Sequence, residues 1–171
     1  PVLIYWPALV DSKHINEVVH FNGKSKELKP TSQLNFEEIY YQTEPVKIPD
    51  APKGETSHVP LGTLFGARSG DKGGCANLGV WAKDLDAFAF LSSFLTIEKL
   101  KELMPDLKEF KIERFDLPNI LSLNFYIHDI LEDGVSSNSR KDAQAKSLGE
   151  YLRAKKANIP SSLLETLNEY G

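Results

Sequence analysis

The residues best suited to chemistry in this chain lie close together, between positions 67 and 80. Four glycines fall within ten residues there, and glycine tolerates positive φ angles and lets a ligand approach the backbone closely. Consecutive free amides in such a loop form a nest that binds anions. We therefore predict an anion-binding, glycine-rich loop over 68–74, although the same composition also suits a hairpin turn with charged decoration. The candidate site residues here are Arg68, Ser69, Gly70, Asp71, Lys72, Gly73 and Asn77.

A second glycine-containing connection, over 133–140, is expected to open a helix. The free amides and the dipole at a helix N-terminus favour an anion, and Arg140 adds a cation there. If the sheet brings this helix start next to residues 68–74, the two would form one cationic pocket that includes Arg140. Asp142 and Lys146, four residues apart on the expected helix, also permit an ordinary surface ion pair.

Metal and nucleophile chemistry have little support in the sequence. The four histidines are widely spaced and share no ligand motif with the single cysteine, so we expect no metal site and no cofactor. No motif supplies Cys75 with a base, which favours a small buried filler over a nucleophile. His128 falls on the polar parity of its strand and is expected to be exposed.

The composition excludes several classes of protein. The 171 residues are 41% hydrophobic and 26% charged, which is ordinary for a globular chain and rules out collagen-like and fully disordered sequences. A net charge of −4 without a polybasic block argues against nucleic acid or an anionic membrane as the main partner. No apolar stretch approaches the ~18 residues of a membrane span. A single cysteine suits a reducing compartment, the cytoplasm or the mitochondrial matrix.

The chain divides into an N-terminal arm with a linker over 1–57, a domain over 58–156 and a tail over 157–171. Because the arm is rich in apolar groups, we expect it to pack on the sheet, on a partner chain or on a larger domain. The expected elements of the arm and tail are a strand at Val2–Trp6, a short helix that includes Ile15, Val18 and Val19, a turn at Asn22–Gly23, a weakly alternating segment over 34–48, a linker over 49–57 and a tail helix from Ser161 or Ser162.

The domain alternates pairs of strands with helices. Leu121 to His128 has the cleanest period-two pattern and predicts a half-buried antiparallel strand. The order ββαββα predicts an α+β two-layer sandwich of ferredoxin-like type, with the helices on one face and the strands in either the standard or a permuted order. The other expected elements are strands at 59–67, 77–82 and 110–117, a helix from Asp84 or Asp86, a helix between Thr96 and Pro105, and a long helix from 136–139 to Ile159.

The glycine-rich segment resembles a known signature. Residues 67–73 (Ala-Arg-Ser-Gly-Asp-Lys-Gly) followed by Asn77-x-Gly79-Val80 are similar to the C-terminal domain of the AtuA family, the acyclic terpene utilisation proteins. The likeness covers roughly 59–153, and one place departs from the family pattern: Gly74 stands where an acidic residue often follows. The further matching segments are Leu117-Pro118-Asn119, Leu123-Asn124-Phe125, Gly134-Val135 and Arg140-x-Asp142-x-Gln144-x-Lys146.

The resemblance implies a ferredoxin-like domain that usually follows a much larger α/β domain, in proteins that degrade branched or terpenoid acyl compounds as coenzyme A thioesters. In one hypothesis the domain is catalytic: Lys72 or Arg68 holds an oxyanion, and Asp71 orients Lys72 or acts as a base. In the other it is a non-catalytic assembly module, with Asp71 paired to a cation. The implied partners are an acyl-CoA or other anionic small molecule, and a larger domain or a second copy.

Overall fold

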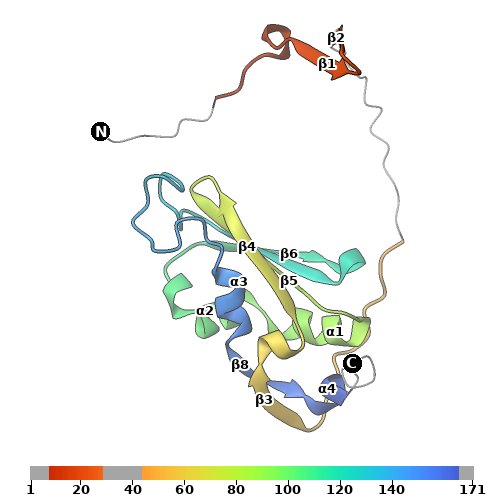
Figure 1. The fold of residues 1–171 in the computed structure, drawn as a ribbon. Helices are drawn as coiled ribbons and strands as arrows, with labels where there is room; N and C mark the ends of the chain where they lie inside the picture. The colour runs from red at the N-terminus through yellow and green to blue at the C-terminus, as the bar shows by residue number, and fades with distance from the viewer. Residues whose placement is uncertain (1–7, 29–43, 166–171) are drawn as a thin grey trace. The chain divides into compact units, whose positions relative to one another are not determined.

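The computed structural model describes residues 8–28 and 44–165. The chain forms two units, 1–44 and 45–171 (Figure 1). The strand expected at Val2–Trp6 and the alternating segment up to residue 43 lie outside the described residues. The linker-like stretch from 49 to 55 carries no helix or strand, and the first strand of the second unit begins at Thr56.

The described part of the first unit is a β-hairpin. Strands β1 (Glu17–Phe21) and β2 (Lys24–Leu28) pair antiparallel after a short 3₁₀ turn, η1 (Ser12–His14). Asn22 and Gly23 join the strands with φ angles of 48° and 71°, which is the two-residue type I′ geometry that an Asn-Gly pair favours. The predicted turn is confirmed. The predicted helix over Val18 and Val19 is wrong, because this turn pairs residues 17–21 with 24–28.

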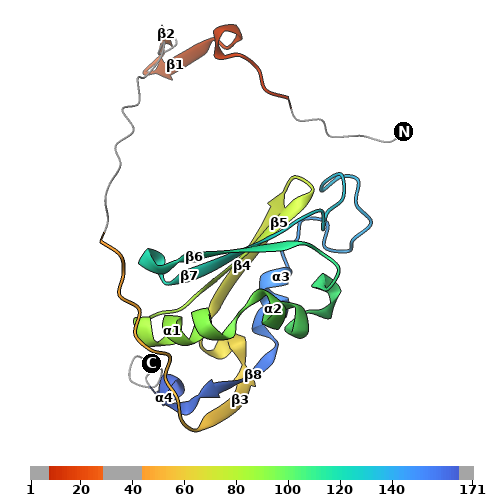
Figure 2. The same cartoon turned by 180° about the vertical axis from the view of Figure 1, so that it is seen from behind.

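A four-stranded antiparallel sheet forms the centre of the second unit. Its strands are β4 (Gly66–Lys72), β5 (Cys75–Trp81), β6 (Ile112–Leu117) and β7 (Ser122–Ile127), and their spatial order is β4-β5-β7-β6. Figure 2 shows β6 and β7 side by side along the sheet. With helices after β5 and after β7, the order ββαββα and the α+β class are confirmed. The strand order is that of a circularly permuted ferredoxin-like sheet.

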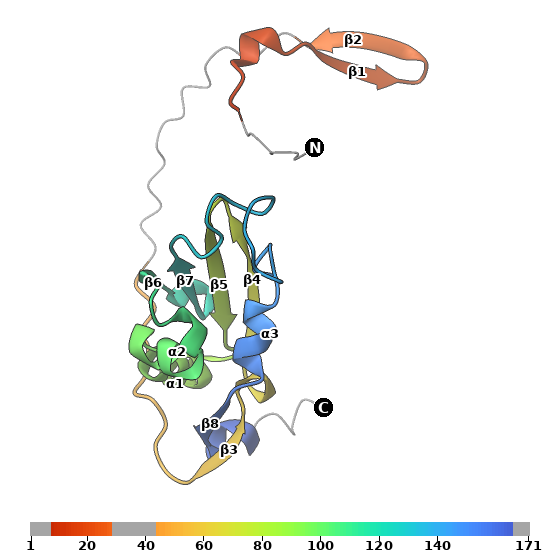
Figure 3. The ribbon, with the colours of Figure 1, turned by 90° about the vertical axis from the view of Figure 1, so that its left-hand side faces the viewer.

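Three helices cover one face of this sheet (Figure 3). They are α1 (Leu85–Phe94), α2 (Ile97–Leu103) and α3 (Leu148–Arg153). The side chain of Asp84 accepts a hydrogen bond from the Ala87 amide at 2.8 Å, and that of Thr96 accepts one from the Lys99 amide at 3.1 Å. Both caps satisfy amides that a helix N-terminus leaves free, so the predicted starts of α1 and α2 are confirmed.

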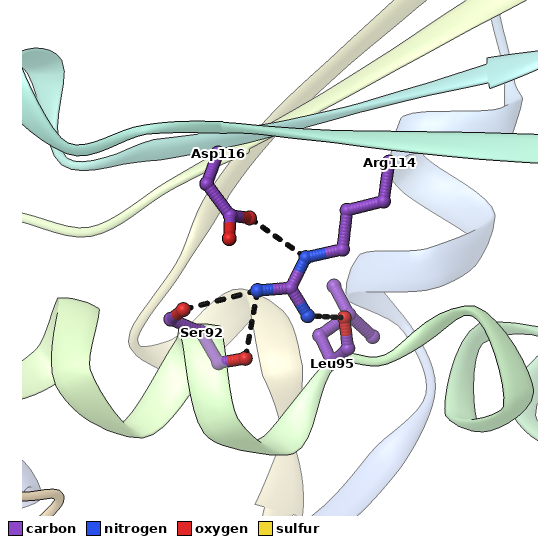
Figure 4. A network of polar contacts seen from close by, with 4 residues as sticks. All are labelled: Ser92, Leu95, Arg114 and Asp116. Atoms are coloured by element: carbon purple, nitrogen blue, oxygen red, sulfur yellow. Dashed lines mark hydrogen bonds and ion pairs between the residues drawn. The ribbon is translucent and has the colours of Figure 1, made fainter.

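The core lies between the sheet and these helices. Leu123, Phe125 and Ile127 of β7 are fully buried and alternate with partly exposed residues, as their period-two pattern predicts. Ala76, Leu78 and Val80 of β5 alternate in the same way. Arg114 of β6 fastens the sheet to α1: its guanidinium donates to the carbonyls of Ser92 and Leu95 at 2.8 and 3.1 Å and pairs with Asp116 (Figure 4).

Two predicted elements differ in the structure. The expected strand over 59–67 is divided into β3 (Thr56–Pro60), a 3₁₀ turn η2 (Leu61–Thr63) and the start of β4, because Leu61, Leu64 and Phe65 turn into the core. The expected long helix from 136–139 to Ile159 is also wrong. Only α3 is helical there, and β8 (Lys156–Pro160) follows it, pairing with β3 across about a hundred residues of sequence before α4 (Ser161–Glu165).

Two further 3₁₀ turns complete the described elements. η3 (Pro105–Leu107) follows α2 and buries Leu107, and η4 (Pro118–Ile120) joins β6 to β7. Leu121 closes η4 with a φ of 51°.

Candidate functional site

The segment 68–72, predicted as a loop, is part of strand β4. Arg68 lies opposite Gly79, Gly70 opposite Asn77, and Lys72 opposite Cys75. Only Gly73, with a φ of 64°, and Gly74 form the turn of the hairpin. Along an extended strand successive amides point in opposite directions, so residues 68–72 do not gather free amides into a nest. The predicted loop over 68–72 is therefore wrong, and the alternative of a hairpin describes this segment.

The strand geometry sends the candidate side chains to two different faces. Ser69 and Asp71 leave from the face that the helices cover, because they pair with Leu78 and Ala76 of the buried side. Arg68 and Lys72 leave from the opposite face. The Asp71 carboxylate and the Lys72 ammonium therefore start from opposite sides of the sheet. The contact between the two residues is a hydrogen bond of 3.0 Å from the Lys72 ammonium to the backbone carbonyl of Asp71.

Ser69 lies in the interior and holds the fold together. Its side chain is only 6% exposed, and its hydroxyl accepts a hydrogen bond of 3.0 Å from the backbone amide of Gly149 in α3. A Cβ at Gly149 would lie 3.2–3.3 Å from backbone atoms of Ala67 and Arg68, so helix and strand approach closely at this glycine. Ser69 was predicted as a substrate-binding residue, and the structure gives it this contact with α3.

Asp71 is paired with Lys146, which the sequence motif contains but which was not predicted as a site residue. The Lys146 ammonium lies 4.0 Å from a carboxylate oxygen of Asp71, and the Asp71 side chain is 33% exposed. The same ammonium lies 3.2 Å from the position that a Cβ would occupy at Gly70. The stretch before α3 therefore runs along β4, as the hypothesis of one joint site required, and Lys146 is the cation that it brings there.

Arg140 lines a cavity that is separate from residues 68–74. It lies in irregular chain rather than at a helix start, so that prediction is wrong. It lines a cavity of about 450 Å³ together with Asp106, Asp142, Glu150 and Tyr151, and no residue of 68–74 lines that cavity. Burial raises the pKa of Asp142, but hydrogen bonds from Ser147 and Lys146 and the charge of Arg140 outweigh it and leave this pKa below its usual value.

The irregular stretch is held by its own polar side chains. The Asn138 amide group donates to the carbonyls of Gly134 and Ala143 at 2.8 and 3.2 Å. The Asp142 carboxylate accepts from the amides of Lys146 and Ser147 at 2.9 and 2.8 Å. Such side chain–backbone bonds compete with helical ones, and this explains why the expected long helix is reduced to α3.

The face of the sheet opposite the helices is called the open face below. Trp81, Phe115 and Leu117 form its apolar corner and are 41–47% exposed. Its centre is polar: the side-chain amide of Asn77 donates to that of Asn124 at 3.4 Å. By register the open face consists of Gly66, Arg68, Gly70, Lys72, Cys75, Asn77, Gly79, Trp81, Glu113, Phe115, Leu117, Ser122, Asn124 and Tyr126.

Glycines form the floor of the open face over β4 and β5. Gly66 is required by packing, because a Cβ there would overlap the Trp81 ring. Gly79 is different, since a Cβ there would meet only the Arg68 carbonyl oxygen, at 3.7 Å. At Gly70 it would meet only the flexible end of Lys146. Among the described residues, contacts leave room for a Cβ at Gly79, which is partly exposed, whereas Gly70 is buried beneath the end of Lys146.

One end of the open face carries titratable groups. Hydrogen bonds from Lys111 and then His128 lower the pKa of the Glu113 carboxyl, and the two nitrogens lie 2.9 and 3.1 Å from it. A hydrogen bond with the Cys75 thiol and partial desolvation raise the pKa of Tyr126. His128 is half-buried against Tyr126, so its expected exposure is only partial.

Neither a metal cluster nor a membrane span is found in the part of the chain that the structure describes. Residues 8–28 and 44–165 contain no group of three or more His, Cys, Asp or Glu side chains able to hold a metal ion. No helix among the same residues is long and apolar enough to cross a bilayer.

Comparison with known families gives one match. The family model described as the AtuA ferredoxin-like domain matches residues 59–158, more than half of the chain. This span runs from the end of β3 through the four-stranded sheet and its helices into β8. No curated protein and no solved structure gives a significant match.

Proposed function

Because this chain belongs to the AtuA ferredoxin-like domain family, we propose that it serves a protein that degrades branched or terpenoid acyl compounds as coenzyme A thioesters. Within that protein its role is assembly rather than catalysis. The open face binds another protein surface, either a larger α/β domain or a second copy of this domain. The single observation that carries this role is the partly exposed Gly79 of the open face, where the described chain leaves room for a Cβ.

Gly79 is the clearest part of that observation. Glycine inside a strand costs about 0.5–1 kcal/mol relative to alanine, so an unneeded glycine weakens the sheet. Contacts within the described chain leave space for a Cβ at 79. Glycine in a strand often marks a place where a ligand or another backbone approaches closely. A partner that rests on the sheet explains why position 79 carries no side chain.

The surroundings of Asp71 favour assembly over acid–base catalysis. A general base needs to reach its substrate, and a carboxylate that is paired and partly covered is better suited to fixing the fold. The Asp71 side chain leaves from the helix side of the edge strand β4, and its carboxylate pairs with the Lys146 ammonium, which also lies beside Gly70. Arg68 and Lys72 leave from the open face. The predicted catalytic pair is thereby divided between the two sides of one strand.

A second candidate function rests on those two cations. Arg68 and Lys72 flank Gly70 on the open face, and both are exposed. Two exposed cations on one strand suit the phosphates of coenzyme A or the carboxylate of an acyl compound. In this candidate the domain binds the anionic substrate on the sheet, and the larger domain supplies the chemistry.

Association measured with a Gly79 variant tests the assembly role. Sedimentation velocity over a concentration series would compare the unaltered chain, Gly79→Gln and the matched control Ser93→Gln. The control adds the same side chain on an exposed position of α1, on the helix side. A second arm would add the purified larger domain of an AtuA-type protein.

We expect the unaltered chain to associate in one of the two arms and Gly79→Gln to weaken that association on the order of tenfold or more, a change of about 1.4 kcal/mol. Ser93→Gln should associate normally, and Gly79→Gln should melt no earlier than the unaltered chain. A chain that stays monomeric and ignores the larger domain would refute the assembly role. Equal association by both variants would show that the partner lies elsewhere.

A further inference from the structure

A second place in the domain has the properties of a ligand site. A cavity of about 270 Å³ lies at the end of the β4–β5 hairpin that is remote from its turn. The 3₁₀ turn η2 and the residues after it form one wall, and Trp81, Lys83 and Arg153 form the other. We propose that this cavity binds a small oxyanion, a phosphate or a carboxylate group, between Arg153, Lys83 and the indole of Trp81.

The guanidinium of Arg153 carries the strongest evidence. One of its terminal nitrogens, Nη1, binds both carboxylate oxygens of Glu150 at 3.0 Å. Its Nε is buried and has no hydrogen-bond partner. A buried donor without an acceptor destabilises the fold, and more so when the group is charged. An oxyanion at the Nε edge would supply the missing acceptor, and that edge of a guanidinium binds carboxylates and phosphates in a bidentate way.

Gly62 packs against that edge. A Cβ at this position would lie 3.1 Å from Nε and 3.0 Å from Cβ of Arg153. Any side chain at 62 would therefore press on the guanidinium and cover its unpaired nitrogen. Gly62 and Arg153 both line the cavity, so the Arg153 side chain borders the space where a ligand would sit.

The charges of the lining also select an anion. Lys83 is a second cation at the cavity, and the lining contains no acidic residue. The larger cavity beside Arg140 differs, because Asp106, Asp142 and Glu150 line it and would repel an anion. Glu150 pairs with Arg153, but it lines the larger cavity beside Arg140 and not the proposed anion site.

Trp81 makes the site observable and gives it an apolar wall. The indole lies over Gly66 and is 42% exposed. An organic carboxylate could place its hydrocarbon part against the ring while its oxygens face Arg153. The cavity shares Gly66 and Trp81 with the open face, but Gly79, on which the assembly role rests, does not line it.

Fluorescence of Trp81 would report binding directly. The chain has two tryptophans, so the Trp6→Phe background leaves Trp81 as the only indole. Inorganic phosphate and 3-methylbutyrate, titrated separately, distinguish a phosphate from a carboxylate site. The variants are Arg153→Gln, Arg153→Lys, Lys83→Gln and Gly62→Ala, and the matched charge control is Lys141→Gln, an exposed cation that does not line this cavity.

We expect saturable binding of at least one probe in the background chain. Arg153→Gln should weaken it on the order of tenfold to a hundredfold, which is the effect of losing a charge-assisted hydrogen bond. Arg153→Lys should lose most of that affinity because lysine keeps the charge but not the fork. Gly62→Ala tests the same edge without a change of charge and should also weaken binding, while Lys141→Gln should not.

Two results would overturn the site. One is the absence of saturable binding of either probe up to tens of millimolar. The other is binding that Arg153→Gln and Gly62→Ala leave unchanged. Thermal melts of each variant identify any that fails to fold, and the variants that do fold, Lys83→Gln among them, then decide the outcome.

Discussion

The hydroxyl of Ser69 and the backbone amide of Gly149, eighty positions apart in the chain, form a buried hydrogen bond of 3.0 Å that joins strand β4 to helix α3. This bond explains the place of a serine within the glycine-rich motif. The strand must approach α3 closely, and the amide of Gly149 needs an acceptor in the interior.

Ser69→Ala should lower the free energy of unfolding by about 1–3 kcal/mol, because it leaves the buried Gly149 amide without an acceptor. Urea titration monitored by circular dichroism measures this change. Ser93→Ala is the control, since Ser93 is exposed on α1. A ligand-binding role for Ser69 without a structural one would instead leave the denaturation midpoint unaltered.

Arg114 fixes the C-terminal end of α1 to β6. It donates to the carbonyls of Ser92 and Leu95 and pairs with Asp116 at 2.8 Å, and helix C-termini favour such cations (Figure 4). Arg114→Gln should destabilise the domain by about 2–4 kcal/mol, since its partly buried partners lose a charged donor. Thermal unfolding would measure the loss.

Arg114→Lys separates charge from geometry. Lysine keeps the positive charge but has no planar fork to reach the four acceptor atoms of Ser92, Leu95 and Asp116. It should recover only part of the stability lost in Arg114→Gln. Full recovery would mean that the charge alone holds the end of α1.

The Asn22–Gly23 turn, the helix caps and the buried strands could be predicted because their signals are local. Asn22–Gly23 requires positive φ angles, Asp84 and Thr96 precede apolar helices, and β7 alternates cleanly. These features determine the ββαββα order, and that order determines the layer architecture.

The candidate site was harder to predict because its glycines suggest a loop. In β4 they serve close approach instead, of Trp81 to Gly66 and of Lys146 to Gly70. Which residues approach the strand depends on α3, far along the sequence. The pairing of β8 with β3 is equally non-local. The sequence of a single strand does not indicate that α3 will pack on β4 or that β8 will pair with β3.

Asp142 makes the stability depend on pH. Its folded-state pKa lies below the ordinary value of 3.8, because hydrogen bonds from Ser147 and Lys146 outweigh the effect of burial. A depressed pKa means that the ionised carboxylate stabilises the fold. This contribution is fully present above about pH 4 and is lost as the pH falls through the lowered pKa.

Asp142→Asn should therefore lower the free energy of unfolding at neutral pH by on the order of 1 kcal/mol. The effect is small because the carboxylate is partly solvated. The difference between variant and unaltered chain should shrink below pH 4. Urea midpoints measured from pH 7 to pH 3 test this. A constant difference across that range would mean that the hydrogen-bond geometry, not the charge, is responsible.

Lys72 and Asp71 were predicted as one catalytic pair, and their separation onto two faces predicts different behaviour in single variants. Lys72 is exposed on the open face, and Asp71 faces Lys146 in a partly exposed pair with a 4.0 Å separation. Exposed ion pairs contribute about 0–1 kcal/mol. Lys72→Ala and Asp71→Asn should therefore melt within a few degrees of the unaltered chain.

Calorimetric titration of coenzyme A and short branched acyl thioesters then distinguishes the two candidate functions. If the open face binds the substrate, Lys72→Ala should weaken affinity on the order of tenfold, whereas Asp71→Asn on the helix side should leave it unchanged. If the domain is an assembly module, the unaltered chain should not bind these ligands at millimolar concentration. Equal losses in both variants would contradict the separation of the two side chains, because a ligand on one face contacts only Lys72.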